Sequence, residues 1–127
     1  QRLLADRENG RLGELCASLG VDLLVLFGSV RRDAERAGDV DIAYAFRHGL
    51  SGDDLAVVNA LGEAYGDVLD IMPLDRAGVV ASYAALGEGE VLVELTPQKF
   101  ANSQMAAFGE YCDTQKFRDA QLEELRR

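Results

Sequence analysis

The chain has 127 residues, of which 48% are hydrophobic and 28% charged, a composition typical of one soluble globular domain rather than of a disordered chain. Its 22 acidic and 13 basic residues give a net charge of −9, which argues against a nucleic-acid-binding protein that grips phosphates, so we expect no direct nucleic-acid partner. No apolar run approaches the roughly 20 residues that cross a bilayer, and we expect a cytoplasmic protein that binds no membrane.

Hydrophobic periodicity and turn residues predict helices and strands that alternate along the chain. In order, they are a helix over 2–19, a strand over 21–27, a short helix over 30–36, a strand over 39–46, a helix over 53–65, a strand over 67–74, a helix over 78–86, a strand over 90–95 and a helix over about 97–126. This order predicts an α/β or α+β fold with two layers. We expect a single domain over 1–127, with a core at about 21–95 followed by the C-terminal helix.

Several details of the predicted helices depend on single residues. Gly10 and Gly13 weaken the prediction of one continuous helix over 2–19. The helix over 53–65 is expected to turn Leu55, Val58 and Leu61 inward.

The C-terminal helix is predicted to begin at Pro97, with Thr96 as its cap. Five apolar residues lie near one stripe of it: Phe100, Phe108, Tyr111, Leu122 and Leu125. The rest of the helix surface carries acidic residues. This acidic part is either an ordinary solvated face or a contact surface for a basic partner.

Two cysteines, Cys16 and Cys112, are far apart in sequence and fall in helical patterns. We expect both to be free thiols in a reducing cytosol, because their spacing does not match a zinc site and a disulfide is the weaker interpretation.

The second predicted strand opens with Asp39 and Asp41, and only Val40 lies between them. Because alternate residues of a strand point to the same face, the two carboxylates project to one side. The preceding strand ends in Gly28 and Ser29, a turn that offers backbone N–H groups and a hydroxyl to phosphate. Carboxylates are hard oxygen ligands for Mg²⁺, so this combination predicts a Mg²⁺–nucleotide site and phosphoryl-transfer chemistry.

A third carboxylate, Asp70, lies inside the apolar run of the strand over 67–74. An unpaired charge is costly there, so we expect a buried or half-buried side chain on a central strand that meets Asp39 and Asp41 in a divalent-metal site able to hold two ions. Asp75 ranks behind Asp70 because it follows the apolar run.

Three further side chains near these carboxylates have two interpretations each. Arg31 and Arg32 are either a solvated basic face of the short predicted helix or a charge clamp on a triphosphate. Tyr44 could stack on a base, but a core or edge aromatic side chain fits its position better.

The combination of Gly28–Ser29, nine intervening residues, Asp39–Val40–Asp41 and then Asp70 in the run LDIM resembles the DNA polymerase β-type nucleotidyltransferase superfamily. More narrowly, it resembles the minimal nucleotidyltransferases (MNT), small domains commonly encoded beside HEPN-domain proteins as antitoxins. The likeness covers about residues 21–94. It implies a nucleotidyltransferase fold, in which a mixed β-sheet is flanked by helices.

The resemblance also implies roles for individual residues. It assigns Gly28, Ser29 and Arg32 to the nucleotide phosphates, and Asp39, Asp41 and Asp70 to Mg²⁺ and catalysis. In the family the third aspartate also activates the acceptor hydroxyl. Asp33 and Gly38 depart from the family pattern, and Asp33 adds a negative charge near the expected triphosphate.

The activity implied by the resemblance is transfer of AMP from ATP to a hydroxyl, with Mg²⁺ as cofactor and pyrophosphate as product. The implied acceptor is a tyrosine of a cognate HEPN toxin ribonuclease, so that the chain would be an antitoxin. Two alternatives stay open. A small-molecule enzyme of the aminoglycoside nucleotidyltransferase type would usually add a second helical domain, and a non-catalytic antitoxin that neutralises by binding would have no use for three clustered carboxylates.

Overall fold

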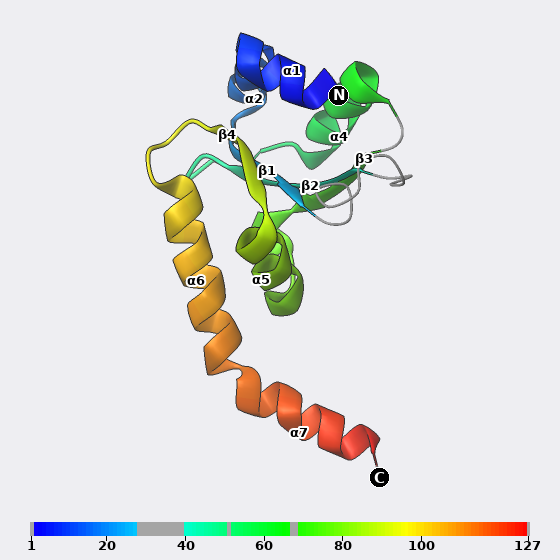
Figure 1. The fold of residues 1–127 in the computed structure, drawn as a ribbon, viewed down its shortest axis with the longest axis vertical. Coiled ribbons are helices and arrows are strands. Elements are labelled where there is room, and N and C mark those ends of the chain that lie inside the picture. Colours follow the sequence, from blue (N-terminus) through cyan, green and yellow to red (C-terminus); the bar gives the residue numbers. More distant parts are fainter. Residues whose placement is uncertain (1, 28–39, 51, 67–68, 127) are drawn as a thin grey trace.

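A four-stranded mixed sheet with helices on both faces forms the body of the chain in a computed structural model (Figure 1). The structure describes residues 2–27, 40–50, 52–66 and 69–126. Within these ranges the elements are α1 (Arg2–Asn9), α2 (Arg11–Leu19), β1 (Val21–Phe27), β2 (Val40–Phe46), α4 (Asp54–Tyr65), β3 (Leu69–Pro73), the 3₁₀ helix η1 (Leu74–Arg76), α5 (Val79–Glu88), β4 (Glu90–Glu94), α6 (Lys99–Asp113) and α7 (Gln115–Leu125). The predicted fold class is confirmed. The short helix predicted over 30–36 lies outside the described residues.

The strands have the order β3-β2-β1-β4. β1 is antiparallel to both of its neighbours, and β2 is parallel to β3. Helices cover both faces of the central strand β1, which explains its nearly continuous apolar sequence and its burial. β3 is an edge strand that ends in Pro73. Proline has no N–H to donate, and this is tolerated at a sheet edge because no hydrogen bond is needed on the outer side. The expected central position for the strand of Asp70 is therefore wrong.

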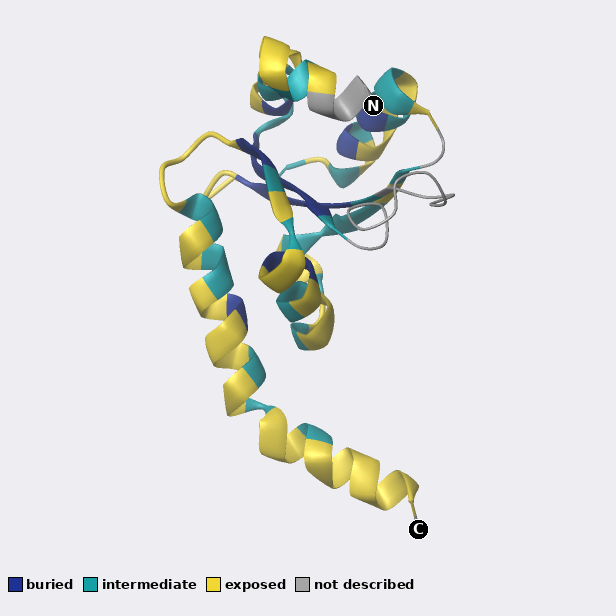
Figure 2. Ribbon diagram, in the orientation of Figure 1, coloured by how far each residue is buried: buried dark blue, intermediate teal, exposed yellow. Residues whose placement is uncertain are grey.

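Burial is concentrated in the strands at the centre of the sheet (Figure 2), and side-chain alternation divides the core between the two faces of the sheet. The first face is covered by α2 and α4, and its buried residues include Leu12, Cys16, Leu24, Leu26, Ile42, Tyr44, Val57 and Leu61. The second face is covered by α5 and α6, and its buried residues are Leu23, Val25, Ala43, Ala45, Ala85, Leu86 and Ala107. Small alanines on the second face let these two helices approach the sheet closely.

Two helices predicted to be continuous are each divided in two. The helix over 2–19 breaks at Gly10, which adopts a left-handed conformation with φ 83° that glycine takes at little steric cost. The C-terminal helix breaks at Thr114 into α6 and α7. It also begins at Lys99 rather than at Pro97, because Gln98 has φ 68° and cannot continue a helix.

The helix α4 faces the sheet differently from the prediction. Val57 and Leu61 are buried, whereas Leu55 is 68% and Val58 44% exposed. The prediction was right for Leu61 and wrong for the other two. Asp54 lies on the same face of α4 as the two buried residues and is hydrogen-bonded to the hydroxyl of Tyr44, a contact consistent with this rotation of the helix about its axis.

The two cysteines are free, as predicted, with Cys16 buried in α2 and Cys112 exposed near the end of α6. None of the helices in the described ranges is long and apolar enough to cross a membrane.

Candidate active site

Asp41 and Asp70 are direct partners in the parallel register of β2 and β3. Asp41 has the same parity along β2 as the second-face residues Ala43 and Ala45, and Asp70 has the same parity along β3 as Met72, which packs against that core. Both carboxylates therefore project to the second face of the sheet. Neighbouring strands lie about 4.8 Å apart, so the two groups are close enough to hold one ion between them.

The surroundings of these two carboxylates differ. Asp41 is half-buried, whereas Asp70 is exposed because β3 is an edge strand. The expected burial of Asp70 is therefore wrong, and the register places it opposite Asp41, one of the two aspartates that it was predicted to meet. Like charges directly opposite each other weaken a sheet, and a divalent cation would relieve that repulsion. Carboxylate oxygens are the ligands that Mg²⁺ prefers, so the pair fits this ion.

The remaining residues predicted for the site lie outside the described part of the chain. They are Gly28, Ser29, Arg31, Arg32 and Asp39, and their roles stay predictions. Among the described residues no group of three possible metal ligands occurs, and the predicted third carboxylate is not one of these residues. Phe27, which ends β1, is the register partner of Asp41, so the described part of β1 ends directly beside this carboxylate.

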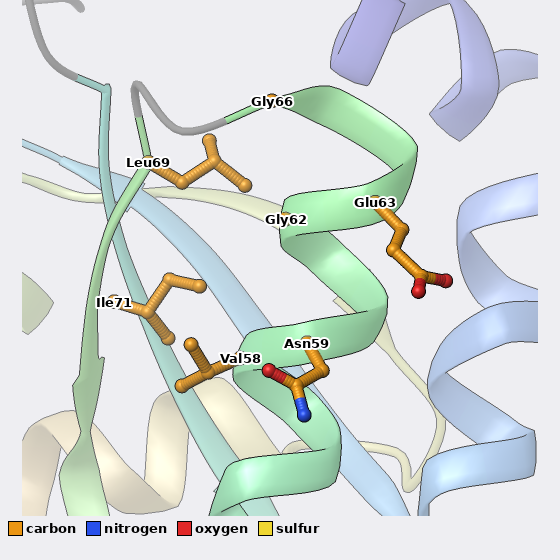
Figure 3. Close-up of a pocket in the computed structure, with 7 residues that line it drawn as sticks. All are labelled: Val58, Asn59, Gly62, Glu63, Gly66, Leu69 and Ile71. Atoms are coloured by element: carbon orange, nitrogen blue, oxygen red, sulfur yellow. The ribbon is translucent and has the colours of Figure 1, made fainter.

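A cavity of about 560 Å³ lies between α4 and β3 (Figure 3). Its lining includes Leu69 and Ile71, whose side chains point toward α4. These residues alternate with Asp70 along β3, so the cavity is on the first face of the sheet and the carboxylates are on the second. The cavity is therefore separate from the carboxylate pair.

A polar cluster that was not predicted from sequence lies at the opposite end of β2. The hydroxyl of Tyr44 donates a hydrogen bond to Asp54, whose other oxygen lies 2.6 Å from the guanidinium of Arg76. The carboxylate of Asp75 accepts a hydrogen bond of 3.1 Å from the backbone N–H of Phe46. These contacts join α4 and η1 to the end of β2, and they place Asp75 at the far end of the strand from Asp41.

Tyr44 was predicted to be a core or edge aromatic side chain, and it lies in the core, where it is 1% exposed. Its hydroxyl contact was not predicted, because the spacing of Tyr44 and Asp54 has no sequence signature. Burial and the hydrogen bond to Asp54 raise the pKa of Tyr44. The pKa of Asp54 is lowered by the hydrogen bonds from Tyr44 and from Arg76.

This lowered pKa predicts a pH-dependent contribution to stability. The folded-state pKa of Asp54 lies below its unfolded value, so its contribution is complete above the unfolded pKa and disappears as pH falls through the folded pKa. We expect the free energy of unfolding of the wild type to exceed that of Asp54→Asn near pH 7, with the difference closing below about pH 4. Denaturant unfolding across this pH range measures it, with Glu63→Gln as the control at an exposed carboxylate. A difference that is constant with pH would contradict the assignment.

No protein-family model matches the sequence, and a search of curated proteins finds no relative. Solved structures resemble it closely in three dimensions. A chain of a toxin–antitoxin complex with AMP-PNP is 22% identical, with a TM-score of 0.74 over 91% of this chain and 96% of that chain. A chain from a tri-AMPylated Shewanella oneidensis HEPN toxin in complex with MNT antitoxin is 21% identical, with a TM-score of 0.73 over 98% and 99%.

A chain of the toxin–antitoxin complex MntA–HepT is 23% identical, with a TM-score of 0.72 over 100% of both chains. This chain has the nucleotidyltransferase fold of the MNT antitoxins. The resemblance that rested on the glycine–serine turn and the three aspartates is therefore confirmed for the fold, and the match extends over the C-terminal helices that lie beyond the motif.

Proposed function

We propose that the chain is a Mg²⁺-dependent nucleotidyltransferase that transfers AMP from ATP to a hydroxyl of a HEPN-domain toxin and so acts as its antitoxin. The observation that carries this proposal is the register of Asp41 and Asp70 on neighbouring strands of this fold. Support comes from the similar structures, which include a toxin–antitoxin complex with AMP-PNP and a tri-AMPylated HEPN toxin in complex with MNT antitoxin.

Six residues would form the site in this proposal. Asp39, Asp41 and Asp70 hold Mg²⁺, and Gly28, Ser29 and Arg32 hold the triphosphate of ATP. When bound, Mg²⁺ supplies positive charge that offsets the negative charge of the triphosphate in the transition state. The glycine permits close approach of the backbone to phosphate, and the arginine provides a charged hydrogen-bond donor.

The reaction forms a bond between the acceptor oxygen and the α-phosphorus of ATP. The bond from that phosphorus to the oxygen bridging the α- and β-phosphates breaks, and pyrophosphate leaves. The proton of the acceptor hydroxyl passes to a carboxylate, for which we propose Asp70. Asp70 is exposed on an edge strand, where a bulky acceptor can approach it, whereas Asp41 is half-buried beside β1.

The acceptor in this proposal is a tyrosine of a cognate HEPN-domain protein. A protein acceptor fits the chain's net charge of −9, which favours encounter with a basic protein and disfavours direct contact with nucleic acid.

Turnover distinguishes modification from simple binding. With ATP and Mg²⁺ present, we expect about one copy of the chain per 20 copies of the HEPN-domain protein to add AMP to the whole toxin pool and abolish its ribonuclease activity, since an enzyme acts repeatedly. Intact-mass spectrometry and an RNA-cleavage assay measure the two effects. An ATP analogue with a methylene bridge between the α- and β-phosphates is the control, because that bond resists cleavage.

Inhibition that needs one copy per toxin, with or without ATP, would overturn the proposal in favour of a binding-only antitoxin. AMP transfer to an aminoglycoside but not to the HEPN-domain protein would overturn it in favour of a small-molecule enzyme.

A further inference from the structure

The last helix, α7, extends from the body of the molecule beyond α5 (Figure 1). Within α7, which the structure describes in full, no residue is buried (Figure 2). A helix of 11 residues is marginal in water unless its apolar side chains find partners. The described part of the chain leaves those side chains exposed, so they are available to another molecule.

The direction of α7 is fixed by a stack of three side chains at the bend after α6. The guanidinium of Arg118 lies 3.8 Å from the centre of the Tyr111 ring and donates a hydrogen bond of 2.8 Å to the backbone carbonyl of that residue. The opposite side of the Tyr111 ring stacks on Tyr83 of α5 with the ring centroids 3.9 Å apart. Arg118 also donates to the hydroxyl of Thr114, where the helices separate. The stack therefore joins α5, α6 and α7.

Exposed apolar side chains continue outward from this stack. Arg118, Leu122 and Leu125 have helical spacing that places them on one side of α7, and Arg118 turns this side toward Tyr111. Leu122 is 54% and Leu125 83% exposed. Phe108 of α6 is 57% exposed and lies 5.9 Å from Tyr83 between ring centroids. We call Phe108, Leu122 and Leu125 the arm surface.

Charge identifies the kind of partner that fits this surface. Asp119 and Glu123 are exposed and lie one helical turn apart beside Leu122. A second copy of the chain would bring the same two carboxylates and the same net charge of −9, so self-association is electrostatically unfavourable. A protein with basic residues around an apolar patch is complementary to this surface.

The position of the arm surface relative to Asp41 and Asp70 favours the same partner. α5 and α6 cover the second face of the sheet, which is the face to which Asp41 and Asp70 project. We propose that the arm surface docks the HEPN-domain protein that the chain modifies, at an apolar patch of that protein bordered by basic residues. This inference rests on the proposed function, and it assigns the binding energy to α6 and α7 while the chemistry takes place at β2 and β3.

The test compares two variants that change the same helix. Leu122→Gln with Leu125→Gln removes apolar area from the arm surface, and Phe117→Gln removes an apolar side chain that is 68% exposed on another side of α7. Glutamine is a good helix former, and circular dichroism checks that α7 persists. Binding of the HEPN-domain protein is measured calorimetrically without ATP. We expect the double variant to bind at least about tenfold more weakly and Phe117→Gln to bind within about twofold of wild type.

Unchanged affinity in the double variant, or equal losses in both variants, would overturn the assignment. Light scattering that shows a wild-type dimer and a monomeric double variant, with unchanged partner affinity, would instead assign the surface to a second copy. AMP transfer separates the two proposals. Arm-dependent binding without AMP transfer supports docking and contradicts the proposed function, whereas equal AMP transfer by wild type and double variant at all partner concentrations contradicts docking alone.

Discussion

Replacing both Asp41 and Asp70 by asparagine is expected to reduce the rate of AMP transfer by at least about 10³-fold. Asparagine keeps the size of each side chain but removes the negative charges that would hold Mg²⁺ in the proposed site and the carboxylate proposed to accept the hydroxyl proton. Incorporation of labelled AMP into the HEPN-domain protein measures the rate. The variant should remain folded, because asparagine fits the same space and the two like charges in register on β2 and β3 are removed.

Asp75→Asn is the matched control for this prediction. Asp75 is close to Asp70 in sequence, but its carboxylate accepts a hydrogen bond from the backbone of Phe46 at the other end of β2. The oxygen of asparagine can accept the same hydrogen bond, so we expect near-normal AMP transfer. A folded Asp41→Asn/Asp70→Asn variant with wild-type activity would refute the catalytic assignment, as would an equally inactive Asp75→Asn.

Two glycines at the end of α5 are expected to respond to alanine with opposite signs. At Gly89 an added Cβ would lie 2.2 Å from Cγ1 of Val25 and 2.3 Å from the backbone oxygen of Ala85. Val25 is fully buried in the central strand, so neither neighbour can move away easily. We expect Gly89→Ala to lower the free energy of unfolding by at least about 2 kcal/mol.

Gly87, two residues earlier, is exposed within α5 and has no atom within 4 Å of an added Cβ. Gly87→Ala should raise the free energy of unfolding by about 0.5–1 kcal/mol, because alanine loses less backbone entropy in a helix. Urea unfolding of both variants measures the difference. Similar effects of the two substitutions would show that α5 does not approach β1 as closely as the structure indicates.

The order of strands and helices could be predicted from sequence because the periodicity of apolar residues changes between elements. Each of the four strands is confirmed near its predicted bounds. Residues 39 and 67–68, which begin two of the predicted strands, lie outside the described residues. The breaks at Gly10 and Thr114 were not predicted as breaks. The helical pattern of apolar residues can continue across a single residue whose backbone conformation ends the helix. At Thr114 the break is accompanied by hydrogen bonds that involve Tyr111 and Arg118.

The meeting of Asp41 with Asp70 was predicted because a charge inside an apolar strand needs a partner. The same argument placed Asp70 on a central strand, and this part was wrong. Apolar residues on either side of Asp70 indicate that its strand packs against the body, but they carry no information about whether another strand lies beyond it. The order of strands is set by pairing between distant segments, which a single sequence does not specify.

The side of α4 that packs against the sheet was mispredicted for a related reason. Leu55 and Val58 fit an amphipathic pattern as well as Val57 does. The side that is buried packs Val57 and Leu61 into the first-face core and also brings Asp54 to the hydroxyl of Tyr44, and the helix sequence alone does not specify these partners.

The contrast between the two thiols makes the chain suitable for selective chemical labelling without removal of a cysteine. Burial raises the pKa of Cys16 to about 12, so this thiol stays protonated at neutral pH and is shielded from reagents in the first-face core. Cys112 is exposed and lies directly after Tyr111, beside the bend that directs α7. A maleimide dye would therefore attach at one position, from which its fluorescence could report the arrival of a bound protein in real time.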